Sequence, residues 1–298
     1  MLKRWLLVGF TWALLVLPAP STGLADEVQD IFDRILGASD QGMFDRVRGA
    51  SDLIKAYMAI KDPAPGDLEN LLAEPVVRNY GAQAVISLMG RNMRYEDGQP
   101  SASFNPVRLF QLLEVLIETP STPPADNQDE ALAIKIRDEM VSPDDRLASG
   151  LTSMISIYVL AQDPDSAMKY YDRLQALPKK SMLDLRRAKA IQTLVWFYCW
   201  TGDLLSAINI YSDLACLDCS ASIQIIQGET LAQLVKALAG ADRLSEAARY
   251  YSELDKQTLD VHVKKHKVQA GRALAAGYRK AGDLKAADEL DTWIKAQK

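Results

Sequence analysis

The residues of this sequence best suited to chemistry are two cysteines at Cys-x-x-Cys spacing, Cys216 and Cys219. Such a pair can form a redox centre, half of a metal site or a small local disulfide. A reactive thiolate needs a helix N-terminus or nearby cations, whereas this pair follows a predicted helix and has Asp218 between its members. Zinc would need two more ligands, and none is close in sequence. In an oxidising compartment we favour a local disulfide first, free thiols second and redox catalysis last.

Two histidines, His262 and His266, are the only ones in the chain, and their i, i+4 spacing would place both on one face of a helix. A zinc protease would need glutamate after the first histidine, and Val263 is there instead. No Ser-His-Asp or Cys-His arrangement, paired carboxylates or glycine-rich phosphate loop can be assembled. A solvated basic helix face is therefore favoured over metal binding. The sequence predicts no catalytic residue, no metal site and no cofactor.

The first 25 residues have the pattern of a secretory signal peptide. Lys3 and Arg4 precede an apolar stretch from Trp5 to Leu17, and small residues follow at Gly23-Leu24-Ala25. This stretch is short for a membrane span, so we favour cleavage before Asp26 over an uncleaved anchor. No other stretch of the sequence is apolar enough to span a membrane. We expect a soluble mature protein that is periplasmic or secreted.

Composition narrows the class of protein further. The formal net charge is −5, and removal of a signal peptide with two cations and no acids would make it −7. A mildly acidic exported chain is a poor candidate for nucleic-acid binding, which rewards clustered Lys and Arg. Alanine and leucine are common, while glycine and proline gather at boundaries. This composition predicts an all-α fold.

A repeat of 40 residues runs through the second half of the chain, with units that begin at Leu151, Ile191, Leu231 and Gly271. Each unit has the apolar i, i+3, i+4, i+7 pattern of a helix, then a turn, then a second helix. Glycine or aspartate in the turn is expected to end the first helix and cap the second. One hairpin cannot bury its apolar faces alone, so the units must stack. Three columns are expected to pack between helices: Ala167, Ala207, Ala247 and Ala287; Tyr171, Tyr211 and Tyr251; and Leu174, Leu214, Leu254 and Ile294.

The pattern resembles the tetratricopeptide repeat, a helix-turn-helix module that stacks into a superhelical solenoid. The best matches are Tyr198-x3-Gly202-Asp203-x3-Ala207-x3-Tyr211 and Tyr278-x3-Gly282-Asp283-x3-Ala287. The period of 40 exceeds the usual length of about 34 residues, so we expect longer helices or longer loops between repeats. The resemblance covers roughly residues 144 to 294. Cys199 lies near the opposite end of its hairpin from Cys216 and is expected to remain a reduced, partly buried thiol.

The chain divides into four predicted segments. Residues 1–25 are the signal peptide, and residues 26–118 form a helical region of divergent repeats or, less favoured, a separate binding domain. Two stretches of this region, PVVRNYGAQAVISLMG and NPVRLFQLLEVLIE, have amphipathic helical patterns. Residues 119–128, TPSTPPADNQ, have the composition of a linker or loop. Residues 129–298 contain the four tetratricopeptide-like repeats.

The resemblance also implies a binding surface, because the first helices of such repeats line a concave groove that holds protein or peptide partners. In the second unit, Trp196 and Trp200 are one turn apart and are expected to anchor an apolar side chain. In the later units, cations are expected to clamp a carboxylate or an acidic segment. The alternative is that the tryptophans pack between repeats and the cations form a solvated face. The predicted protein-binding residues are Lys189, Gln192, Trp196, Trp200, Lys236, Arg272, Arg279 and Lys280.

The function predicted from the sequence is that of a non-catalytic, exported scaffold, adaptor or assembly factor for a protein or peptide partner. One alternative is a structural or regulatory subunit of an envelope machine for secretion or motility. The other is a thiol-active envelope factor that works through Cys216 and Cys219. Thiol titration distinguishes the last of these, because a structural disulfide is oxidised and inert.

Overall fold

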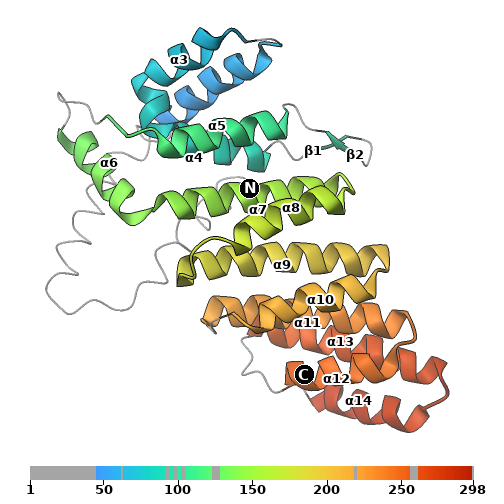
Figure 1. Cartoon of the computed structure of the whole chain (residues 1–298). Coiled ribbons are helices and arrows are strands. Elements are labelled where there is room, and N and C mark those ends of the chain that lie inside the picture. The colour runs from blue at the N-terminus through green and yellow to red at the C-terminus, as the bar shows by residue number, and fades with distance from the viewer. Residues whose placement is uncertain are drawn as a thin grey trace, which may run out of the picture.

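The computed structural model of the protein describes residues 45–61, 63–91, 94–96, 99–101, 105–122, 128–217, 220–255 and 261–296. The predicted signal peptide lies outside these ranges. Within them the chain is helical apart from one short β-hairpin, and the helical hairpins stack one upon the next (Figure 1). The prediction of an all-α repeat solenoid is confirmed. None of the described helices is long and apolar enough to cross a membrane.

The first part of the structure is a group of helices with one two-stranded antiparallel sheet, in which Arg94 lies opposite Ser101. Both stretches that were predicted to be amphipathic helices are helical, and Pro75 and Pro106 stand at their first positions. Proline suits this position because it has no N–H to donate and its φ is already helical. The elements are a helix over 45–59, α3 (Pro65–Ala73), α4 (Pro75–Arg91), β1 (Arg94–Glu96), β2 (Gln99–Ser101), α5 (Pro106–Glu118) and α6 (Gln128–Met140).

The four repeats form four helical hairpins. The first helices contain 18, 21, 20 and 20 residues, whereas the second helices contain 12, 12, 12 and 13. The long period therefore resides mainly in extended first helices. The hairpins are α7 (Pro143–Leu160) with α8 (Pro164–Gln175), α9 (Ser181–Thr201) with α10 (Leu204–Ala215), α11 (Ala221–Gly240) with α12 (Leu244–Asp255), and α13 (Val261–Lys280) with α14 (Leu284–Ala296).

A residue with positive φ stands in the turn of every hairpin, again at intervals of 40 residues: Gln162, Gly202, Asp242 and Gly282. This left-handed conformation ends a helix and reverses the chain. In three hairpins the following aspartate caps the second helix; Asp203, for example, accepts a hydrogen bond from the Ser206 N–H. The third hairpin differs from the prediction, because Asp242 takes the positive-φ position and Arg243 precedes α12. Aspartate tolerates the left-handed conformation better than most residues. Asp242 can therefore take the position that glycine holds in two of the other hairpins.

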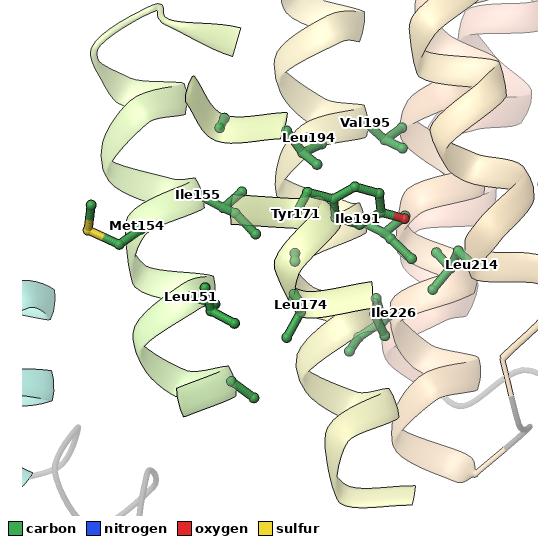
Figure 2. Close-up of a cluster of buried hydrophobic side chains, with 14 of the residues drawn as sticks. Leu151, Met154, Ile155, Tyr171, Leu174, Ile191, Leu194, Val195, Leu214 and Ile226 are labelled. Atoms are coloured by element: carbon green, nitrogen blue, oxygen red, sulfur yellow. The ribbon is translucent and has the colours of Figure 1, made fainter. Parts of the chain in front are cut away.

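The packing columns predicted from the repeat are buried. All four alanines of the alanine column have no exposed surface, and the three tyrosines are also buried. Figure 2 shows Ile155 of α7 and Tyr171 of α8 pointing toward Ile191 of α9, so one hairpin packs against the first helix of the next. The Tyr171 hydroxyl also donates to the Asp213 carboxylate of α10, at 2.7 Å. Packing and hydrogen bonding therefore both join neighbouring hairpins.

The N-terminal helices belong to the same stack, because α4 and α5 both contact α7. One cluster of buried apolar side chains extends from Ala50 to Leu274. Gly150 of α7 permits this approach, since a Cβ there would collide with Leu113 and lie 3.2 Å from Phe110 Cε2. The proposed boundary at residues 119–128 is described only in part, and the division of the chain into segments remains a prediction.

Candidate protein-interaction site

The first helices α7, α9, α11 and α13 contact one another in sequence and form a continuous layer (Figure 1). The second helices pack on one side of this layer. Side chains of the first helices that remain exposed therefore lie on the side that the second helices leave uncovered. Trp196 and Trp200 of α9 are such side chains, 44% and 70% exposed. This exposure is compatible with a binding role, and the assignment of both tryptophans as binding residues remains a prediction.

A set of exposed and half-buried side chains on α9 follows a regular spacing of three and four residues, which is the spacing of one helix face. Lys189, Trp196 and Trp200 are exposed, whereas Arg186 and Thr193 are half-buried. We call this set the α9 stripe. It places two cations in the N-terminal half of the helix and two tryptophans in the C-terminal half. Its members are Arg186, Lys189, Thr193, Trp196 and Trp200.

Two of the predicted cations are already used within the chain. Arg279 pairs with Asp291 of α14, and Lys280 pairs with Asp242 of the preceding hairpin at 2.7 Å. Arg272 is exposed and Lys236 is half-buried. The predicted basic clamp thus has fewer unengaged cations than the sequence indicated.

Arg186 was not among the predicted site residues. Its neighbour Arg187 is only 2% exposed and pairs with Asp184 at 2.7 Å. Arg187 also donates to the backbone carbonyls of Leu177 and Pro178, so it ties α9 to the end of the preceding hairpin. One arginine of the pair is therefore structural, and the other, Arg186, is half-buried on the α9 stripe.

The structural role of Arg187 recurs in the next repeat. Gln227, 40 residues later, is also buried and donates from its amide to the Leu214 carbonyl, at 2.9 Å. Lys267 holds the same column in α13 and is buried, with its ammonium 4.3 Å from the centre of the Trp293 ring. The burial of this column was not predicted from the sequence, because long polar residues are usually exposed. Their repetition at 40-residue intervals was the available signal.

Gln192 is only half-buried and lies beside the stripe. Its amide donates to Glu229 of α11 at 3.1 Å, and His266 Nε2 of α13 lies 3.7 Å from the other oxygen of the same carboxylate. These three residues connect three successive first helices. Gln192 thus has a structural contact, whereas no side-chain hydrogen bond or ion pair of Lys189 is found in the described residues. The side chain of His262 lies outside the described part of the structure.

The cysteines show no arrangement for thiol chemistry in the described residues. Cys199 is a free, half-buried thiol, as predicted, and burial raises its pKa to about 12 although nearby Lys236 opposes the shift. Cys216 is exposed and free at the C-terminal end of α10. Its proposed partner Cys219 lies outside the described residues, so the structure gives the disulfide no support and the pairing remains a prediction.

Comparison with known proteins agrees with the repeat architecture. The PPR repeat family, a helical-repeat family related to the tetratricopeptide repeat, matches residues 151–177, which span the second half of α7 and all of α8. No curated protein and no solved structure matches the chain. The fold and this match define a helical-repeat protein, a class whose repeats support a protein-binding scaffold role. Within the described ranges, no cluster of side chains is suited to hold a metal ion.

Proposed function

We propose that this protein is an exported helical-repeat scaffold that binds a protein partner through the uncovered face of its first helices. The observation that carries the proposal is the exposure of Trp196 and Trp200, one turn apart on α9. Tryptophan is enriched at binding hot spots because a large apolar ring gains much from losing water on contact. Large exposed apolar side chains grouped on one helix face are unusual on a surface that stays in water.

The adaptor role is favoured over a thiol-active factor by the state of the cysteines. A raised pKa leaves Cys199 as a neutral thiol near pH 7. Cys216 lies at the C-terminal end of α10, whereas reactive cysteines are typically found at helix N-termini. A subunit of an envelope machine would use the same surface in a permanent contact. Export is proposed from the N-terminal sequence alone. Sequencing the mature protein checks it, with Asp26 as the expected first residue and a retained Met1 as the contrary result.

Site-specific photo-crosslinking tests the binding surface. The crosslinker p-benzoylphenylalanine would replace Trp200 in one protein and Leu284, an equally exposed residue of α14, in the control. We expect a protein partner to be crosslinked from position 200 and not from position 284. In the Trp196→Ala/Trp200→Ala variant, we expect partner affinity to fall by about 30-fold or more, the loss typical of a hot spot. Equal crosslinking at both positions, or an affinity that the double variant leaves unchanged, would refute the proposed surface.

A further inference from the structure

Two cations of the α9 stripe have no partner of their own. Neither Arg186 nor Lys189 makes a hydrogen bond or ion pair within the described part of the chain, although Arg187 beside them is fully engaged. Loss of surrounding water lowers the pKa of both groups, and Arg186 lowers that of Lys189 further. The carboxylate of Asp145 in α7 opposes the shift in the pKa of Arg186, and it is held by the Ser142 N–H and hydroxyl. The free protein therefore keeps two like charges close together without a hydrogen-bonded counter-ion.

The acids that face this part of α9 from neighbouring helices, Asp145 of α7 and Glu229 of α11, are already held by hydrogen bonds from Ser142 and Gln192. Helix α9 has no acidic residue between Asp184 and Asp203, and α7 has no charged residue between Arg146 and Asp163. The side chains that α7 contributes are largely hydroxyls, and Thr152, for example, donates to the backbone of its own helix. Such a surface is electrostatically complementary to an anion. Neither cation joins two helices through a hydrogen bond or ion pair in the described structure.

The tryptophans lie at a fixed distance from this positive end. Seven residues separate Lys189 from Trp196, which is about 10 Å along a helix at about 1.5 Å per residue. Trp200 extends the apolar part by a further turn. An extended peptide advances about 3.3 Å per residue. In a ligand that reaches both ends, the apolar side chain thus lies about three positions along the chain from the negative one, with two residues between them.

From this arrangement we infer that the α9 stripe binds an acidic peptide segment with carboxylates at Arg186 and Lys189 and an apolar side chain at Trp196 and Trp200. The inference rests on the proposed protein-binding function and specifies its ligand. An arginine guanidinium can hold a carboxylate through two parallel hydrogen bonds, and a lysine ammonium adds a second charge. Single-stranded nucleic acid could also use cations and aromatic rings. Two cations in a chain of net charge −5 are too few to favour it.

Four synthetic peptides test the inference by fluorescence anisotropy. The probe is Glu-Glu-Ser-Ser-Phe-Leu, accompanied by its reversed sequence because the orientation of the bound chain is not fixed. The controls are Gln-Gln-Ser-Ser-Phe-Leu and Glu-Glu-Ser-Ser-Ser-Ser. We expect the probe or its reverse to bind at least about tenfold more tightly than both controls, as loss of a charged hydrogen bond or a buried aromatic contact requires. Binding should weaken as salt is raised from 0.05 to 0.5 M, within the range in which salt screens charges.

Protein variants assign the contact to the stripe. We expect Lys189→Gln and Arg186→Gln each to lower affinity for the probe while leaving affinity for the Gln-Gln peptide unchanged. Because neither side chain makes a hydrogen bond or ion pair in the described part of the free protein, we expect the melting temperature not to fall. Lys189→Gln alone provides the test if Arg186→Gln fails to fold. Lys295→Gln, an exposed lysine of α14, serves as the control and should change nothing.

Three results would overturn the inference: no binding of either acidic peptide at 1 mM, equal binding of Glu and Gln peptides, or tighter binding of a uridine oligonucleotide than of the probe. These results are independent of the crosslinking experiment. If Trp200 crosslinks a partner and the acidic peptides do not bind, the scaffold function stands and the ligand assignment fails. If position 284 crosslinks as well as position 200, the proposed surface itself is wrong.

Discussion

Replacement of Gly150 by alanine should destabilise the protein although alanine is the better helix former. Gly150 is buried in the middle of α7, where the repeats meet the N-terminal helices. An added methyl group would collide with Leu113 and crowd the ring of Phe110, and both side chains are themselves buried. They therefore have no open space into which to move.

The two opposing effects can be weighed. Overpacking of a filled core costs about 1–3 kcal/mol, and the severity of this collision places the cost in the upper half of that range. Replacement of glycine by alanine within a helix stabilises the helix by about 0.5–1 kcal/mol. We therefore expect a net loss of about 1–2 kcal/mol in the free energy of unfolding. Gly90→Ala is the matched control, because Gly90 lies in the last turn of α4 with nothing within 4 Å of an added Cβ.

Urea unfolding followed by the helical circular dichroism signal measures both variants, and an unchanged m-value is needed before midpoints are compared. Gly90→Ala should be as stable as the parent protein or slightly more stable. If Gly150→Ala were as stable as the parent protein, α5 and α7 would not be in close contact. The core shared by the N-terminal helices and the repeats would then be wrong.

Two other predictions concern the thiols and the contact between hairpins. Without reductant, Cys216 should resist a thiol reagent at pH 8 if it forms the predicted disulfide with Cys219, and labelling of Cys216 under these conditions would exclude that bond. Cys199 should be labelled only on unfolding, since it is half-buried and its raised pKa of about 12 leaves almost no thiolate between pH 7 and 9; rapid labelling of the folded protein would contradict this. Tyr171→Phe removes the hydrogen bond to the next hairpin and should cost about 1 kcal/mol in urea unfolding. Tyr211→Phe is the control and should be nearly neutral, because no hydrogen bond of the Tyr211 hydroxyl is found in the described structure. Equal losses of unfolding free energy in the two variants would show that the hydrogen bond from Tyr171 to Asp213 does not stabilise the stack.

Much of the repeat architecture could be predicted because its determinants are local. Helical periodicity identifies the two helices of each unit, and residues such as Gly202 and Gly282 mark the turns through their positive φ. The small β-hairpin was missed, although Asp97-Gly98 between its two strands is a common hairpin dipeptide. A short polar segment with no apolar alternation gives too weak a signal for a strand.

The candidate site was predicted only in part. Trp196 and Trp200 were identified, and their exposure agrees with a binding role. Arg186 was missed because the dipeptide Arg186-Arg187 does not reveal which side chain turns inward. In a helix, neighbouring residues point about 100° apart, so the position of the preceding hairpin decides that Arg187 is buried and Arg186 only half-buried.

The sequence by itself determined the helical composition, the 40-residue period and the columns of alanine and tyrosine that must pack, because these follow from spacing along a single helix. Only the tertiary structure decided which charged groups remain available. Arg279 finds Asp291 on the second helix of its hairpin, and Lys280 finds Asp242 in the preceding repeat, 38 residues away. Such pairs depend on how hairpins are placed in space, and the periodicity of any one helix carries no information about them. Within the described residues, the same placement leaves the side chains of Arg186 and Lys189 without a hydrogen-bonded counter-ion on the helix that carries two exposed tryptophans.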